Sequence, residues 1–432
     1  MAVNNTLENI LSLQSPAKHL AGFQQENRNA FAKWNIPALK HEEWRYTRIR
    51  NAFREDLSIV SDAQLDANIL KGILLPGTET ANRIVFVNGK YTPSLGHQHD
   101  DISSLVIKSL DQAAGDEDAD FVKSNLGHSQ RYHPDGINAL NGSFAGQGAY
   151  IRVNRGKTLE QPIIIIHING PEAGYKFSQP RLLVNVEAAA AVQLIASYHN
   201  LGSESLTNEV TEICTAKDAV LHYVKLQNEG TGSTHVGTTH IRQLGKSMTH
   251  AVTITLSGDL VRNNLNMVME AEHGESHMYG LYLLGGETVA DNHTIVDNAM
   301  PHCYSNELYK GIMDASSTGV FNGKIFVRKD AQKTNAYQSN KNILIGENAS
   351  ANTKPQLEIL ADDVKCSHGC TIGKLDEDAL FYLRARGISE QKAKAILLHA
   401  FAIDILDQIK HEAIRAYADR IVSERLSFEY NA

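Results

Sequence analysis

The spacing of hydrophobic and polar positions changes character along the chain. Near the start, leucine and isoleucine recur at helical spacing, and Phe31 and Trp34 continue the apolar face until Pro37 interrupts it. This pattern predicts helix in the first part of the chain. Further along, a strand-like apolar run ends at the pair Asn88-Gly89, which is typical of a tight turn between strands.

From residue 146 to residue 373, short strand-like segments follow one another with hardly any helical signal. Small acidic turns recur between them, at residues 217–219, 257–259, 314–315, 330–331, 347–349 and 361–363. Such a repeat predicts a β-solenoid, because one coil cannot bury its inner face alone and must stack on its neighbours. We also expect the asparagine-rich stretches 263–266 and 340–342 to form turns, since asparagine tolerates left-handed conformations.

After Gly373 the helical period returns. Asp376 is a predicted N-cap, and Gly387 followed by Ser389 predicts a helix end and a restart. The second helix is apolar over a wide arc, so part of it is expected to pack on the β body and part on a partner. The sequence thus predicts three regions: a mixed, mainly helical domain (1–145), a β-helix core (146–375) and a helical C-terminal domain (376–432).

Composition narrows the class of protein. The chain has 432 residues, of which 42% are hydrophobic, enough for a large core. Its formal net charge of −8 argues against nucleic acid or an anionic membrane as the main partner, because both require a basic face. We expect a cytoplasmic protein, since four cysteines fit a reducing compartment and neither a signal peptide nor a membrane-length apolar stretch stands out.

Signals for an enzyme are weak. The string Leu244-Gly245-Lys246-Ser247 resembles the end of a phosphate loop, but His240 stands where that motif needs glycine. We therefore predict no nucleotide site and a non-enzymatic protein. One alternative is a β-helix enzyme that acts on polysaccharides, which would require clustered carboxylates that do not stand out here.

One cluster of candidate ligands does stand out, in the string Val364-Lys365-Cys366-Ser367-His368-Gly369-Cys370. On a strand, Cys366, His368 and Cys370 share one face, with successive members about 6.6 Å apart. Thiolate and imidazole suit iron, zinc or iron–sulfur species. One strand cannot surround a metal with bonds of about 2.0–2.3 Å, so these residues predict half of a site that another coil or subunit completes. The alternative is two buried thiols around a structural histidine.

Around this motif the chain resembles the SufB/SufD family of iron–sulfur cluster assembly proteins. SufB-like chains carry a scaffold cysteine in the stretch matching 346–353, and its absence here favours the SufD type. Cys370 departs from the family pattern, in which a small residue such as alanine is more familiar, so its role as a ligand stays open. The resemblance rests on segments 41–47, 305–311, 319–324, 331–342, 352–355, 361–369 and 381–388.

The resemblance implies a right-handed parallel β-helix flanked by helical segments. It implies a scaffold subunit that works with a SufB-like paralogue and a SufC-like ABC-type ATPase, or that forms a homodimer when alone. It also implies that His368 and Cys366, with Cys370 as a further candidate, hold iron or a nascent cluster transiently at the subunit interface. A purely architectural subunit that binds no metal is the remaining alternative. The expected interface residues are Lys365, Cys366, His368, Phe381, Tyr382, Arg384 and Arg386.

Overall fold

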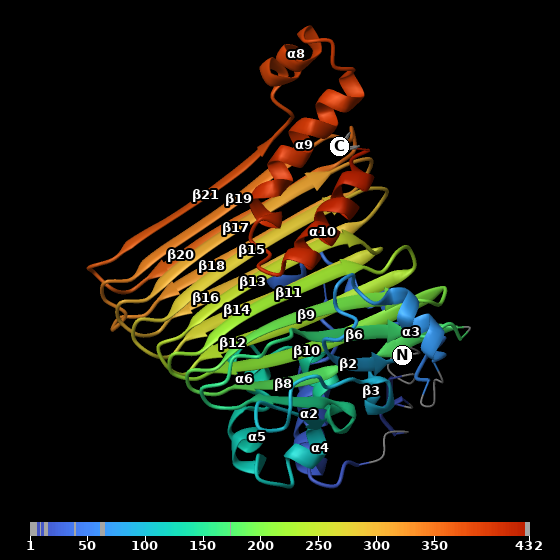
Figure 1. Ribbon diagram of the computed structural model, residues 1–432, viewed down its shortest axis with the longest axis vertical. Coiled ribbons are helices and arrows are strands. Elements are labelled where there is room, and N and C mark those ends of the chain that lie inside the picture. The colour runs from blue at the N-terminus through green and yellow to red at the C-terminus, as the bar shows by residue number, and fades with distance from the viewer. Residues whose placement is uncertain are drawn as a thin grey trace.

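The computed structural model of the protein describes residues 7–8, 10–12, 16–38, 40–60, 65–172 and 174–427. Its body is a parallel β-solenoid in which the chain passes alternately through two facing sheets, one of 11 strands and one of 10 strands (Figure 1). Successive coils stack in register, so that Thr318 lies beside Val289 and Ser350 beside Thr318. The predicted fold class, a mainly β solenoid flanked by helices, is confirmed.

The first sheet contains, in spatial order, β20 (Ser350–Ile359), β18 (Thr318–Val327), β16 (Val289–Asn298), β14 (Leu260–Met269), β12 (Ser233–Gln243), β10 (Glu204–Thr215), β8 (Arg181–Val186), β5 (Ala149–Val153) and β4 (Leu105–Ser109). Strand β7 (Tyr175–Ser178) pairs with β10, and β1 (Leu57–Ser58) pairs with β7. The second sheet contains β21 (Lys365–Gly373), β19 (Asn335–Leu344), β17 (Tyr304–Met313), β15 (Glu275–Leu284), β13 (Met248–Ser257), β11 (Val220–Asn228), β9 (Ala191–Asn200), β6 (Ile163–Asn169), β2 (Asn82–Val87) and β3 (Lys90–Tyr91).

Four strands that precede residue 146, β1 to β4, already belong to the sheets. β2 pairs in parallel with β6, and β4 pairs antiparallel with β5. The predicted turn at Asn88-Gly89 joins β2 to β3, with both residues at positive φ. The division into 1–145, 146–375 and 376–432 stays a prediction.

Helices pack on the outer faces of both sheets. The N-terminal group packs against the outer face of the first sheet, where Phe177, Leu206 and Val236 meet helical side chains. The C-terminal pair α9 (Glu390–Leu406) and α10 (Glu412–Arg425) packs on the second sheet (Figure 1). None of the described helices is both long and apolar enough to cross a membrane. The remaining helices whose bounds the structure describes are α2 (Ala21–Trp34), α3 (Ala67–Ile73), α4 (Leu110–Ala113), α5 (Ala119–Asn125), α6 (His128–Tyr132), α7 (Gly136–Gly142), α8 (Glu377–Ala385) and the 3-10 turns η1 (Glu42–Trp44), η2 (Ile49–Ala52), η3 (Pro93–Leu95) and η4 (Ala145–Gln147).

The predicted helix boundaries near the C-terminus are confirmed. The side chain of Asp376 accepts hydrogen bonds from the backbone N–H groups of the first turn of α8, as an N-cap does. Gly387 follows α8 with a φ of 85°, and the Ser389 hydroxyl caps α9. Local residue chemistry therefore sets the break between these two helices.

The expectation that the asparagine-rich stretches form turns is wrong. Residues 263–266 lie within β14 and residues 340–342 lie within β19. Their amide groups bond to one another inside the coil: Asn263 Nδ2 donates to Gln227 Oε1 at 2.8 Å, and Asn342 Nδ2 donates to Asn340 Oδ1 at 2.7 Å. Other interior side chains supply hydrogen-bond partners to these amide groups, so asparagine here serves the interior rather than the turns.

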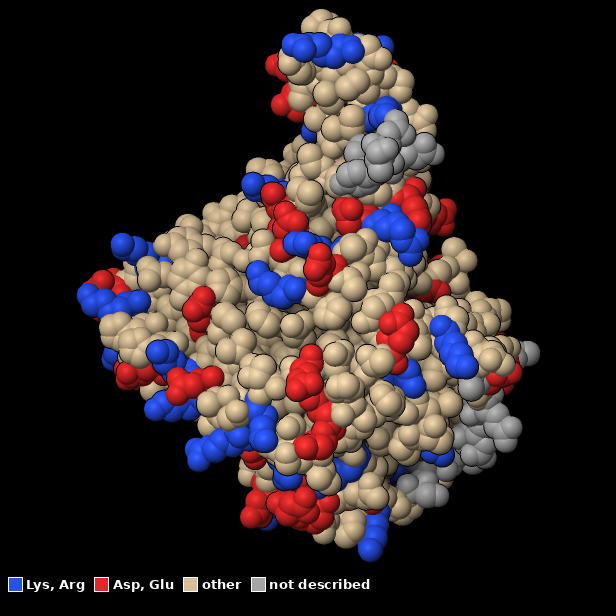
Figure 2. Space-filling model, in the orientation of Figure 1, with Lys and Arg blue, Asp and Glu red and all other residues tan. Residues whose placement is uncertain are grey.

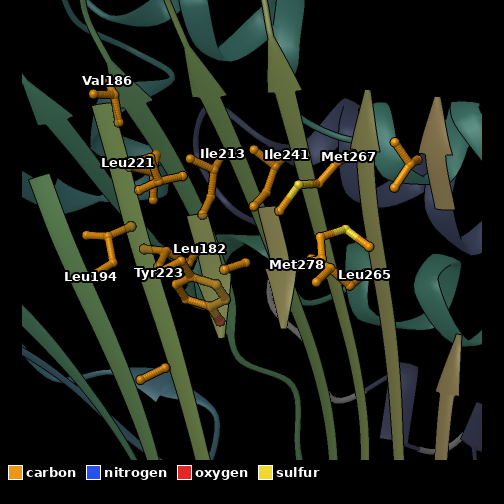
Figure 3. Close-up of a cluster of buried hydrophobic side chains, with 14 of the residues drawn as sticks. Leu182, Val186, Leu194, Ile213, Leu221, Tyr223, Ile241, Leu265, Met267 and Met278 are labelled. Carbon is orange, nitrogen blue, oxygen red and sulfur yellow. The ribbon is translucent and has the colours of Figure 1, made fainter. Parts of the chain in front are cut away.

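The interior of the solenoid is apolar through its middle coils. Figure 3 shows side chains from both sheets directed into the space between them. This packing buries the inner faces that no single coil could bury alone. Residues in this apolar interior include Leu182, Val186, Leu194, Ile213, Leu221, Tyr223, Ile241, Leu265, Met267 and Met278.

Polar groups also enter the interior in the early and the last coils. In the early coils Lys225 Nζ donates to Glu209 Oε2 at 2.8 Å, with both side chains almost fully buried. In the last coils the interior contains Glu307, Gln338, Asn340 and Asn342, each at most 4% exposed. Buried polar groups require hydrogen-bond partners inside the protein, so these four residues specify how the last coils pack together.

Candidate metal site at the end of the solenoid

Strand β21 is the last strand of the second sheet, and its outer edge is open. Among the described strands it pairs with β19 alone. The backbone N–H of Lys365 donates to Thr334 O at 2.9 Å, toward β19. Because neighbouring residues of a parallel strand bond to opposite sides, the backbone groups of Cys366, His368 and Cys370 face the open edge.

The side chains of these three residues occupy the inward-facing positions of the last coil. In register with them on β19 lie Ala336, Gln338 and Asn340, all of which are buried, whereas the intervening Tyr337 and Lys341 are exposed. The strand places Cys366, His368 and Cys370 on one face, and that face is the uncovered interior of the solenoid.

Exposure differs among the three candidate ligands. Cys366 is partly buried and packs against the solenoid core, whereas His368 and Cys370 are exposed. Burial raises the pKa of the Cys366 thiol above 9.0, although a backbone hydrogen bond involving Ala336 acts in the opposite direction. The neutral thiol is therefore the resting form near pH 7, and a bound cation would have to displace its proton.

The three side chains do not form a compact cluster by themselves. In the part of the chain that the structure describes, the one group of three that brings possible ligand atoms within 4.8 Å is Asp116, Glu117 and Asp118. Those carboxylates already have cationic partners in Lys108 and Arg152. The arrangement on β21 thus supplies ligands without enclosing a metal.

The predicted interface residues lie on two separate surfaces. Lys365, Cys366 and His368 belong to β21, whereas the other four belong to α8 or follow it directly. Helix α8 projects beyond the last coil (Figure 1), and basic side chains lie over the tip of this projection (Figure 2). Phe381 is 74% exposed and Tyr382 is 56% exposed, with the Arg386 guanidinium 4.7 Å from the Tyr382 ring centroid.

Two residues near the candidate ligands were missed by sequence reasoning. Gln338 is the register partner of His368, and Glu307 is the register partner of Gln338 one coil earlier. The alignment between strands about 30 residues apart follows from turn lengths that vary from coil to coil, which the sequence pattern does not fix. In the sequence, the one hint of this pair is that a glutamate, Glu307, lies within a strand-like segment.

Comparison with known proteins identifies the class. A profile described as the SUF system FeS cluster assembly SufBD core domain matches residues 167–401, and one described as the SufBD protein N-terminal region matches residues 6–165. An iron–sulfur cluster assembly SufBD family protein of Synechocystis sp. is 32% identical over 90% of this chain and 87% of that protein. The chain belongs to the SufBD family of iron–sulfur cluster assembly proteins.

Within the family, the chain is similar to proteins of the SufD type. The iron–sulfur cluster assembly protein SufD of Escherichia coli is 28% identical over 93% of this chain and 92% of that protein. Another relative, the chloroplastic protein ABCI7 of Arabidopsis thaliana, is 29% identical over 88% of this chain and 81% of its own length. The resemblance predicted from the motifs is confirmed.

Proposed function

We propose that this protein is a non-enzymatic subunit of an iron–sulfur assembly complex and that its last coil supplies half of a site for iron or a nascent cluster. Cys366 and His368 are the proposed ligands, and Cys370 is a further candidate. The observation that carries this proposal is the placement of a thiol and an imidazole on the inward face of an uncovered coil. Iron and the nascent cluster are cargo here, held transiently and passed on.

A SufB-like paralogue is the proposed partner at this end. An open strand edge offers unpaired N–H and C=O groups to a strand of another chain, and backbone pairing of this kind gives affinity. Apolar side chains lie beside the edge: Ile372 is 47% exposed and Leu360 is 55% exposed. A partner that pairs with β21 would cover them and bring its own ligands to Cys366 and His368. In the absence of the paralogue, a second copy of this chain can use the same edge.

A SufC-like ABC-type ATPase is the proposed partner of the helical projection. The exposed aromatic pair Phe381 and Tyr382, flanked by Arg384 and Arg386, has the composition of an interface hot spot. Nucleotide hydrolysis then belongs to the partner and none to this chain. Movement of α8 and α9 would be transmitted to the second sheet, on which α9 packs through β15 and β17. We place the complex in the cytoplasm, where thiols stay reduced.

The test is anaerobic loading of the complex formed with the SufB-like partner and the SufC-like ATPase. Iron and sulfide are added to the wild type, Cys366→Ser, His368→Ala and the control Ser367→Ala, which lies on the same strand but faces outward. We expect His368→Ala to lose most of the bound iron and Cys366→Ser to lose part of it, whereas the control loads normally. All four proteins should form the complex and unfold at similar temperatures.

The same experiment separates this function from a purely architectural one. If Cys366→Ser and His368→Ala load iron and sulfide as well as the wild type does, this chain binds its partners but contributes no ligand. In that case the proposed metal role is wrong, while the family membership is unaffected.

A further inference from the structure

Gln338 lies directly beneath His368 in the interior of the solenoid. The two residues are Cα partners on β19 and β21, strands that lie about 4.8 Å apart in a sheet. Gln338 is 3% exposed, so its amide group belongs to the closed interior, whereas His368 stands on the uncovered coil above it. The two side chains therefore occupy successive levels of one inward-facing column.

The amide group of Gln338 is held in one orientation. Its Nε2 donates a hydrogen bond to Glu307 Oε2 at 2.7 Å, one coil further inside. On the facing sheet, Gly323 leaves the space that the amide needs, since a Cβ at that position would lie 2.3 Å from Gln338 Nε2 and 2.7 Å from Phe321 Cζ. Packing and hydrogen bonding together direct the nitrogen toward Glu307 and away from the last coil.

The amide oxygen of Gln338, Oε1, has no hydrogen-bond donor beside it. Within the described residues, Gln338 Oε1 is buried and accepts no hydrogen bond. A buried acceptor without a donor is unfavourable, so native proteins supply one. The next residue of the column is His368, whose imidazole ring carries an N–H in every protonation state.

Glu307 is suited to hold the amide across the neutral pH range. It is 1% exposed, and burial raises its pKa to about 7, with the hydroxyl of Thr294 and the amide of Gln338 acting in the opposite direction. Either protonation state retains a carboxyl oxygen that can accept from Gln338 Nε2. The hydrogen bond between these two residues does not depend on a fixed charge.

We propose that Gln338, held by Glu307, is a positioning residue whose Oε1 accepts a hydrogen bond from one ring N–H of His368 once the imidazole turns onto the amide. This bond fixes the tautomer and orientation of the imidazole, so that the other ring nitrogen presents its lone pair to the open end of the solenoid. Histidine ligands of metals are commonly fixed in this way by a carbonyl or carboxylate acceptor. The role in metal binding rests on the proposed function, whereas the tautomer of His368 is a property of this chain alone.

The tautomer can be measured by nitrogen-15 NMR of the full chain labelled at histidine, because the chemical shifts of the two ring nitrogens report which one carries the proton. The signals of His368 are identified by their loss in His368→Ala. We expect one dominant tautomer in the wild type and a shift toward a mixture, with a change of more than about twofold in the tautomer ratio, in Gln338→Met. Glu307→Gln keeps an acceptor for the amide and should retain the wild-type tautomer.

A matched control is available on the same strand. Asn340 is fully buried, faces inward and donates to Tyr282 Oη at 3.0 Å, but its register partner is Cys370 rather than His368. Asn340→Leu should lower the unfolding temperature by an amount similar to Gln338→Met and leave the His368 signals unchanged. Should Gln338→Met fail to fold, Gly323→Ala displaces the amide without removing it and is expected to change the same signals.

The outcomes distinguish this proposal from the function on which it rests. If folded Gln338→Met or Gly323→Ala shows the wild-type tautomer of His368, the positioning role is wrong, although His368 can still be a ligand. If the tautomer changes as expected but His368→Ala loads iron normally, the positioning role stands and the metal role fails.

Discussion

Glu307 Oε2 accepts a hydrogen bond from Gln338 Nε2 at 2.7 Å, and this bond links two neighbouring coils in the interior of the solenoid. It buries a carboxyl group without any cationic partner that shifts its pKa. The stability of the last coils therefore depends on pH through Glu307, and the proposed orientation of His368 depends on Gln338.

Glu307→Gln should stabilise the protein more at high pH than at low pH. The pKa of Glu307 rises from 4.5 to about 7 on folding, so the folded state holds a proton that the unfolded state releases. Stability then falls as pH rises from about 4.5 to 7 and is constant above that range. At about 1.4 kcal/mol per pKa unit, the variant should gain up to about 3 kcal/mol at pH 8 relative to pH 4. Urea unfolding at both pH values measures this difference, and an equal effect at both would contradict it.

Glu212→Gln should show the opposite dependence on pH. Arg181 donates to Glu212 Oε2 at 2.6 Å, and the backbone N–H groups of Gly127 and Ser129 each donate to this carboxylate at 2.8 Å. Burial acts to raise the pKa, but Arg181 and the backbone donors outweigh it and lower the pKa to about 2. The carboxylate therefore stabilises the fold above pH 4.5, and this contribution is lost as pH falls toward 2.

We expect Glu212→Gln to cost about 3–5 kcal/mol at pH 7, because Arg181 is left buried without its anion. The cost should shrink at pH 3. Hydrogen exchange should also show earlier opening of α6, which contains Ser129, than of the central strands. Unchanged stability at pH 7 would mean that this ion pair does not attach the N-terminal helices to the solenoid.

Two substitutions at Cys370 test whether a partner strand pairs with the open edge. One removes the backbone N–H together with the thiol, and the other removes the thiol alone. Cys370→Pro removes a backbone N–H that faces away from β19, whereas Cys370→Ser retains it. We expect the proline variant to weaken association with the SufB-like partner by at least about tenfold and the serine variant to weaken it far less. Analytical ultracentrifugation measures both, and equal affinities would place the partner elsewhere.

Lys310→Met should loosen α9 from the second sheet. Lys310 is 3% exposed, and its Nζ donates to Phe401 O at 2.9 Å and to Asp404 Oδ2 at 2.5 Å. Loss of these bonds should cost about 1–3 kcal/mol, since they involve a charged donor. Hydrogen exchange in α9 should accelerate accordingly. The control is Lys394→Met on α9, which removes an exposed ion pair with Glu390. It should lower the free energy of unfolding by less than about 1 kcal/mol.

The sequence pattern predicts the solenoid and the helix ends well because these features depend on local chemistry. Asp376, Gly387 and Ser389 act through their own backbone or nearest neighbours, and the structure places each as predicted. The alternation of Cys366 with His368 on one strand also follows from local geometry.

Other features depend on contacts between coils and could not be predicted. The asparagines of β14 and β19 look like turn residues in isolation, yet Asn263 bonds to Gln227 across the interior and Asn342 bonds to Asn340 on its own strand. Likewise, the alignment of Glu307 with Gln338 and of Gln338 with His368 depends on the lengths of intervening turns. Register of this kind is a property of the stacked coils.

The most direct test of the central claim is covalent trapping at position 366. Cys370→Ser is combined with the SufB-like partner and the SufC-like ATPase, and a short thiol-reactive crosslinker is added, since Cys214 and Cys303 are buried. We predict a covalent adduct between the two β-solenoid subunits that requires Cys366 and is prevented by loading with iron and sulfide. A complex that assembles fully yet gives no adduct through Cys366, or the same adduct before and after loading, would contradict the account.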